Sequence, residues 1–195
     1  MQIAIFENRF LGSGKTTLLN HILTQKHGKK LAIIENEFGN VGVDGSLVSA
    51  PSDAVFELND GCVCCTVRED LLEIFEQILS RRSEFDHILI ETTGLAEPEP
   101  VMRLFDRPSI RASFTLTGVV TVVDAHHLEQ SLNDVQACGE QIAFADLLIL
   151  NKTDGISGQA LNALESRLRV LNPLATLCRA QHSKIEIHQL LELES

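Results

Sequence analysis

A glycine-rich stretch near the start of the chain restricts its possible folds more than any other feature of the sequence. An apolar run at residues 3–6 is typical of a buried strand, and the apolar residues between 18 and 23 share one face of a helix. Between them lies the segment Phe10-Leu11-Gly12-Ser13-Gly14-Lys15-Thr16-Thr17. A strand, a glycine-rich turn and a helix in this order collect backbone N–H groups at a helix N-terminus, which attracts polyphosphate. This order predicts a phosphate-binding loop in an α/β fold.

The residue types in this loop have separate roles in phosphate binding. Gly12 and Gly14 allow the backbone to approach a ligand closely because they carry no Cβ atom. Lys15 supplies a charge for the outer phosphates, and Thr16 supplies a hydroxyl for Mg²⁺. Arg9 stands where the full signature has a glycine, so a degenerate loop that no longer binds nucleotide is the alternative interpretation.

Carboxylates follow two predicted strands that we expect to end beside this loop. A buried strand over residues 31–34 leads to Glu35 and Glu37. These are candidates for binding Mg²⁺ or a transition metal or for positioning water, and solvated loop acids are the alternative. A second apolar strand ends in Glu91 and is followed by Gly94. Phosphate-loop enzymes use this pattern to hold a Mg²⁺-linked water and to sense the γ-phosphate.

Three cysteines, Cys62, Cys64 and Cys65, are crowded into a turn directly before a predicted helix. The helix dipole favours thiolates at this position, and thiolates are soft ligands that suit Zn²⁺, Co²⁺ or Ni²⁺ better than Mg²⁺. The turn offers only these three ligands, so a fourth would come from Glu35, Glu37 or a histidine. Small core residues and a redox-active dithiol are the two alternatives for this cluster.

A polar tetrapeptide at a later strand end predicts which base is bound. The predicted strand at residues 146–150 is followed by Asn151-Lys152-Thr153-Asp154. Asp154 can accept two hydrogen bonds from N1 and N2 of guanine, which adenine does not offer, while Asn151 and the Lys152 stem shape the base pocket. The alternatives are an ordinary turn and an ATPase, and Asp154 argues against the second.

We expect the whole chain, residues 1–195, to form one domain. The order of its predicted strands and helices indicates a three-layer α/β/α sandwich around a mostly parallel sheet. A further buried strand is expected over residues 119–124, where β-branched residues predominate. Ser183 and Glu186 are expected to cap a final helix near the end of the chain.

The composition favours some classes of partner over others. The net charge is −11, from 16 basic and 27 acidic residues, which disfavours nucleic acid and anionic membranes as partners. No run approaches the ~20 apolar residues of a membrane span, and the chain does not begin with a signal-peptide pattern. The five cysteines are an odd number with three close together, which suits a reducing cytoplasm and a metal or reactive site.

Five motifs in a fixed order carry a resemblance to a known family. They are Phe10-Leu11-Gly12-Ser13-Gly14-Lys15-Thr16-Thr17, Glu35-Asn36-Glu37-Phe38-Gly39, Gly61-Cys62-Val63-Cys64-Cys65, Glu91-Thr92-Thr93-Gly94 and Asn151-Lys152-Thr153-Asp154. The chain resembles the GTPase domain of the CobW-type metallochaperones, which are relatives of the nickel-delivery GTPases of urease and hydrogenase assembly. The resemblance extends from about residue 3 to residue 180, and family members usually continue into a C-terminal domain that this sequence does not contain.

The resemblance implies a P-loop NTPase fold and a cytoplasmic GTPase with GTP and Mg²⁺ as ligands. Lys15 and Thr16 would serve the phosphates and Mg²⁺, with Glu37 as a further candidate for Mg²⁺. Glu91 would serve Mg²⁺ or its water, and Gly94 the γ-phosphate. Guanine would be held by Asn151, Lys152 and Asp154.

The resemblance also implies a transition-metal site and a function. Cys62, Cys64 and Cys65 would bind Zn²⁺, Co²⁺ or Ni²⁺, with Glu35 as an extra ligand, and metal transfer to a client metalloprotein would be coupled to GTP hydrolysis. The alternative is a non-catalytic metal store or sensor whose nucleotide site is impaired by Arg9. The sequence leaves the client and the oligomeric state open, and a dimer is compatible with it.

Overall fold

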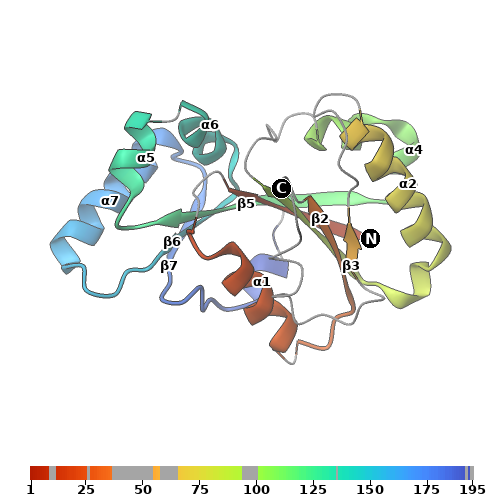
Figure 1. The fold of residues 1–195 in the computed structure, drawn as a ribbon, viewed down its shortest axis with the longest axis horizontal. Coiled ribbons are helices and arrows are strands. Elements are labelled where there is room, and N and C mark those ends of the chain that lie inside the picture. Colours follow the sequence, from red (N-terminus) through yellow and green to blue (C-terminus); the bar gives the residue numbers. More distant parts are fainter. Residues whose placement is uncertain are drawn as a thin grey trace.

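The computed structural model describes one parallel sheet with helices on both faces, over residues 1–8, 12–25, 27–36, 55–57, 66–93, 101–134, 136–191 and 193 (Figure 1). Seven strands pair in the order β3-β2-β4-β1-β5-β6-β7, and every pairing is parallel. The strands are β1 (Gln2–Asn8), β2 (Leu31–Asn36), β3 (Val55–Glu57), β4 (His87–Thr93), β5 (Thr115–Asp124), β6 (Leu147–Asn151) and β7 (Thr176–Arg179).

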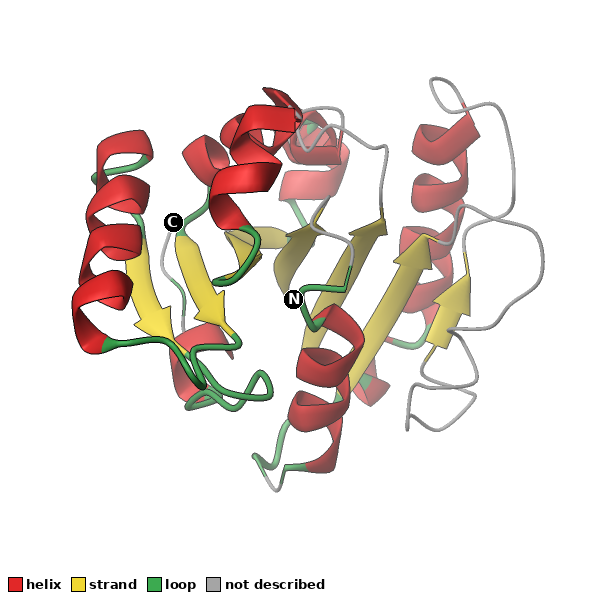
Figure 2. Cartoon of the chain, turned by 60° about the vertical axis from the view of Figure 1, so that its left-hand side comes forward, coloured by secondary structure: helices red, strands yellow, loops and turns green. Residues whose placement is uncertain are grey.

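The helices form the outer two layers. They are α1 (Lys15–Thr24), α2 (Thr66–Ser80), α4 (Pro108–Arg111), α5 (Leu128–Asp134), α6 (Gln136–Phe144), α7 (Gly158–Leu171) and α8 (His188–Leu191), with short 3-10 turns η3 (Arg82–Glu84) and η4 (Arg103–Asp106). Buried residues of α1 and α8 join one apolar cluster, whereas those of α2, α4, α5, α6 and α7 line the opposite face of the sheet. Figure 2 shows both layers. The predicted three-layer α/β/α sandwich is confirmed.

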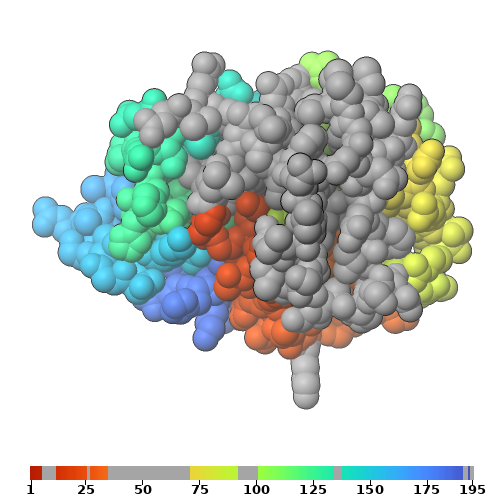
Figure 3. Space-filling view, viewed as in Figure 1, coloured from red at the N-terminus to blue at the C-terminus, as the bar shows by residue number. Residues whose placement is uncertain are grey.

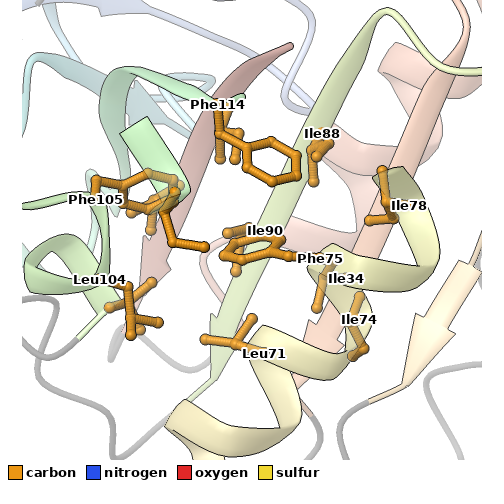
Figure 4. Close-up of a cluster of buried hydrophobic side chains, with 14 of the residues drawn as sticks. Ile34, Leu71, Ile74, Phe75, Ile78, Ile88, Ile90, Leu104, Phe105 and Phe114 are labelled. Carbon is orange, nitrogen blue, oxygen red and sulfur yellow. The ribbon is translucent and has the colours of Figure 1, made fainter. Parts of the chain in front are cut away.

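The largest apolar cluster fills the space between α2 and the centre of the sheet. Phe75 of α2 is fully buried, and its ring lies 4.8 Å from that of Phe114 and 5.9 Å from that of Phe105, centroid to centroid. Ile88 and Ile90 of β4 form the floor of this cluster (Figure 4). Burial of this surface fixes α2 against the sheet.

Helix α1 is held against the other face by a short apolar stripe. Leu18, Leu19 and Ile22 are completely buried, as their helical spacing predicts. His21 on the same helix lies with Nε2 3.2 Å from the carbonyl oxygen of Ile185, so α1 is in contact with the segment that follows β7. Figure 3 shows these two parts of the chain side by side at the surface. The anchored helix places its N-terminus at the carboxyl end of β1.

The expectation that Ser183 and Glu186 cap a final helix is wrong. The last helix that the structure describes, α8, begins at His188. Ser183 is fully buried in a left-handed conformation with φ of 54°, and its hydroxyl donates to the carbonyl oxygen of Gly14 at 2.8 Å. The hydroxyl is therefore engaged in a contact 169 residues away along the chain rather than in capping the next turn.

Candidate nucleotide-binding site

The glycine-rich turn lies between β1 and α1, at the carboxyl end of the sheet. Gly12 and Gly14 have φ of 71° and 106°, which are left-handed values that favour glycine, and Gly14 is the residue directly before the first turn of α1. Ser13 is buried, Lys15 and Thr16 are half-buried, and Thr17 is exposed. Arg9, Phe10 and Leu11 lie outside the described residues. From Gly12 onward the backbone thus has the glycine turn and helix N-terminus that polyphosphate binding requires.

Gly14 is surrounded so closely that no side chain would fit. A Cβ atom at this position would lie 2.5 Å from Nδ2 of Asn151 and 2.7 Å from Oγ of Ser183. Both distances are below any normal contact, so the absence of a side chain is required here by space as well as by the backbone angle. The close approach brings the glycine-rich turn against the loops that follow β6 and β7.

Asn151 links these three loops through hydrogen bonds. Its Nδ2 donates to the carbonyl oxygen of Ser13 at 2.7 Å and to Oγ of Ser183 at 2.8 Å, and its Oδ1 accepts from the N–H of Ser183 at 2.9 Å. Only 2% of Asn151 is exposed, so the amide acts on the protein itself and holds the loops in one arrangement. Two segments predicted separately, around residues 14 and 151, are therefore brought together.

Ser183 is the residue of this arrangement whose role was missed from the sequence. Its place after the last strand carries a usable signal, because the carboxyl ends of parallel strands share one edge of a sheet. A polar residue a few positions after β7 is then expected at the same edge of the sheet as the loops that follow β1 and β6. Local capping preferences concealed this longer-range relation.

The backbone after Asn151 turns sharply and exposes the predicted base-binding side chain. Lys152 has φ of 59°, and Oγ1 of Thr153 donates to the carbonyl oxygen of Ala180 at 3.0 Å. Asp154 follows and is exposed. A turn anchored at Asn151 and Thr153 therefore presents the Asp154 carboxylate to solvent, where it can accept hydrogen bonds from a ligand.

The ammonium group of Lys152 is bound by a buried carboxylate at the end of β5. Its Nζ lies 2.8 Å from Oδ2 of Asp124, whose side chain is 4% exposed, while the Lys152 side chain is 40% exposed. Burial by itself would raise the pKa of Asp124, but hydrogen bonds from Lys152, the His126 N–H and His127 together hold this pKa below its ordinary value. Asp124 is therefore a carboxylate at neutral pH.

The predicted acidic residues lie on adjacent central strands. Glu91 of β4 is 7% exposed, and its Cα pairs with those of Phe6 on β1 and Glu35 on β2. Glu35 and Glu91 are thus cross-strand neighbours in the backbone, close to the carboxyl edge of the sheet. The side chain of Glu35, and both Glu37 and Gly94, lie outside what the structure describes.

The cysteine turn that we expect to bind metal, with Cys62, Cys64 and Cys65, also lies outside the described residues. Helix α2 begins at Thr66, directly after the turn. Within the described part of the chain there is no group of three or more His, Cys, Asp or Glu residues that could hold a metal ion. Cys178 is a poor ligand because burial raises the pKa of its thiol to about 11.

Helices long and apolar enough to cross a bilayer are missing from the described ranges.

The arrangement defines the class of protein: an α/β domain of the phosphate-loop type, whose candidate nucleotide site lies at the carboxyl edge of a parallel sheet. The particular family follows from the sequence. Residues 5–179 match the family described as CobW/HypB/UreG, nucleotide-binding domain. The chain belongs to this family.

Curated relatives with similar sequences include zinc chaperones. The chain is 37% identical to the zinc chaperone YjiA of Escherichia coli over 91% of its own length and 57% of that protein. It is 37% identical to the zinc chaperone CobW of Pseudomonas aeruginosa, over 95% of the chain and 58% of that protein. It is 36% identical to the zinc-regulated GTPase metalloprotein activator 1 of Schizosaccharomyces pombe, over 95% of the chain and 47% of that protein. The chain thus spans roughly half the length of these relatives.

Solved structures agree with this assignment. The Zn(II)-bound YjiA GTPase of Escherichia coli superposes with a TM-score of 0.74 at 30% identity, covering 98% of this chain and 60% of that one. The nickel complex of HypB from Helicobacter pylori has a TM-score of 0.64 at 14% identity, covering 94% of this chain and 79% of that one, and shows a shared fold.

Proposed function

We propose that this chain binds GTP with Mg²⁺, hydrolyses it, and couples the hydrolysis to the transfer of a bound transition metal. The observation that supports the nucleotide part is the bonding of Asn151 to Ser13 and Ser183, because it holds the glycine-rich turn beside the loop that contains Asp154. Membership of a family with zinc-chaperone and GTPase relatives supports the metal part.

The phosphates would lie at the N-terminus of α1. Lys15 and the loop N–H groups would neutralise the outer phosphates, and Thr16 would bind Mg²⁺, with Glu37 as a second candidate ligand. Glu91 lies in the carboxyl half of the neighbouring central strand, and in this proposal it would hold Mg²⁺ or the attacking water. Hydrolysis would then proceed by in-line attack of water on the γ-phosphorus, with positioning and charge neutralisation as the main contributions, and Gly94 would respond to loss of the γ-phosphate.

Guanine would be selected by Asp154. Its exposed carboxylate can accept from N1–H and N2–H of guanine, whereas adenine presents no such pair of donors. Asn151 is occupied by protein groups, so its contribution is to hold the pocket rather than to choose the base.

The metal is cargo in this proposal. Cys62, Cys64 and Cys65 precede α2, where the helix N-terminus favours thiolates, and Zn²⁺ is the first candidate with Co²⁺ and Ni²⁺ after it. Glu35 is the proposed extra ligand, and its backbone pairs with that of Glu91. Metal and nucleotide affect each other only if the metal binds the GTP and GDP states with different affinities.

GTP turnover measured across a panel of buffered metals, with calorimetric GTP binding alongside, tests this function. We expect GTP binding, slow basal hydrolysis and a change in rate with the transferred metal. Zinc binding without any GTP binding would refute the proposal and leave a metal store or sensor. If GTP turnover appeared only in the Arg9→Gly variant, Arg9 would be identified as the residue that impairs the nucleotide site.

A further inference from the structure

A buried carboxylate outside the predicted set of site residues binds the base loop. Asp124 is the last residue of β5 and is 3% exposed. Oδ2 accepts from Nζ of Lys152 at 2.8 Å and lies 3.1 Å from Nδ1 of His127, and Oδ1 accepts from the N–H of His126 at 2.9 Å. The function described so far assigns no role to this group of contacts.

Backbone pairing holds the ends of β5 and β6 together independently of the ion pair between Asp124 and Lys152. The Cα of Asp124 pairs with that of Asn151 across β5 and β6, and the N–H of Ala125 donates to the carbonyl oxygen of Asn151 at 3.0 Å. Asp124 therefore stands at a fixed position beside the base loop. The ion pair with Lys152 is added to this ordered strand end, and it fixes the ammonium end of the lysine side chain.

A lysine side chain needs such an anchor if its stem is to serve as a binding surface. Its four-carbon stem has high rotamer entropy, which is lost when a ligand fixes it. Here the ammonium end is bound while the side chain stays 40% exposed, so the methylene groups form an ordered apolar surface before any ligand arrives. Ordering before binding reduces the entropy lost on binding.

We propose that Asp124 is a positioning residue for the guanine site, which anchors the Lys152 ammonium so that the lysine stem is ordered to pack on the face of the base. The inference rests on the proposed function, since it requires a guanine nucleotide in this pocket. In this role Asp124 strengthens binding of the base and leaves binding of the phosphates unchanged.

A double-mutant cycle with two ligands tests this claim. Asp124→Asn, Lys152→Met and the double variant are compared with the parent chain for affinity to a ribose-labelled fluorescent GDP and, by competition, to inorganic tripolyphosphate. We expect Asp124→Asn to weaken GDP binding about two- to tenfold, as expected when one long side chain must be ordered on binding. Tripolyphosphate affinity stays the same, and Asp124→Asn costs nothing further when Lys152 is already Met.

Asp146→Asn is the matched control. Asp146 is a partly buried acid next to the start of β6, at the other end of the strand from Asn151, and its Oδ2 accepts from the N–H of Val119 at 2.8 Å, so Asp146→Asn removes the same charge away from Lys152. GDP affinity is expected to be unchanged in this variant. If Asp124→Asn does not fold, Asp124→Glu replaces it, with a smaller loss of GDP affinity and the same selectivity.

Three results would overturn the inference while GTP binding by the parent chain stands. They are unchanged GDP affinity in Asp124→Asn, an equal loss for GDP and tripolyphosphate, and additive losses in the double variant. Failure of the parent chain to bind GDP would instead refute the proposed function, and this inference with it.

Discussion

At the scale of single residues, Gly14 is held by two constraints of different origin. Its φ of 106° is unfavourable for residues with a side chain, and a Cβ atom would meet Asn151 and Ser183 at 2.5 and 2.7 Å. The second constraint is the more severe, because both neighbours are fixed by hydrogen bonds to the loop that Gly14 belongs to. A substitution there must break the contacts that join the loops.

We expect Gly14→Ala to lower the free energy of unfolding by more than the backbone penalty of about 1–2 kcal/mol for a left-handed residue. The excess, about 1–3 kcal/mol, comes from overpacking against Asn151 and Ser183. Gly28→Ala is the control, because Gly28 has a similar φ of 72° with nothing within 4 Å of the added Cβ. Urea unfolding of both variants without nucleotide gives the comparison. Equal losses would show that Asn151 and Ser183 adjust without cost.

The roles of Ser183 and Asp124 could not be predicted from the sequence, because their partners lie far away along the chain. The loop at residues 12–16 and the tetrapeptide at 151–154 were recognisable because their residue types occur in a fixed local order. Ser183 carried a local pattern typical of a helix cap, and the contact with Gly14 that overrides it spans 169 residues of sequence. Asp124 reads as an acid at a strand end, and only the register with Asn151 gives it a partner.

At the scale of elements, the ends of β5 and β6 are joined by a charged contact that depends on pH. Three hydrogen bonds outweigh burial and lower the pKa of Asp124 from its ordinary value of 3.8. A carboxyl whose pKa is lower in the folded chain stabilises the fold above its unfolded pKa, and this contribution is lost as the pH falls through the folded pKa. The junction is therefore strongest at neutral pH.

We expect Asp124→Asn to destabilise the chain at neutral pH by about 1.5–3 kcal/mol, the usual contribution of hydrogen bonds to a charged group. The difference from the parent chain should stay constant down to about pH 5 and then shrink below the ordinary pKa of 3.8. Urea unfolding of both proteins between pH 7 and about pH 3 measures it. A difference that grows on acidification would contradict the assigned direction of the shift.

The order of elements followed from sequence more readily than their exact extent. The run of apolar segments separated by helical stripes was enough to predict a parallel sheet covered on both faces, because buried parallel strands are apolar throughout. The final helix was the exception. Leu190 of this helix packs into the cluster beneath α1, but the chain before it forms the loop around Ser183, so the helix begins only at His188.

At the scale of the whole molecule, the sheet brings motifs from both ends of the sequence to one edge. The net charge of −11 would repel a polyphosphate on average, so binding has to rely on local groups such as the N-terminus of α1 and Lys15. The same half of the sheet carries Glu35 and Glu91 on adjacent strands. In the proposed function Glu35 binds the metal and Glu91 serves Mg²⁺, so coupling between metal and nucleotide would act through the paired strands β2 and β4.

Reciprocal binding measurements give the most demanding test of that coupling. If Zn²⁺ changes the affinity for a non-hydrolysable GTP analogue by some factor, the analogue must change the affinity for Zn²⁺ by the same factor, because both factors report one coupling free energy. We expect the factor to differ from one for the GTP analogue and to be closer to one for GDP.

The double variant Cys64→Ser, Cys65→Ser should lose one stoichiometric Zn²⁺. The effect of Zn²⁺ on nucleotide affinity should then disappear, while nucleotide binding itself persists. Cys178→Ser should retain the metal, since burial keeps that thiol protonated with a pKa of about 11. Unchanged zinc content in the double variant by elemental analysis would place the metal elsewhere. Intact zinc binding with a factor of one would show that metal binding and nucleotide binding are independent.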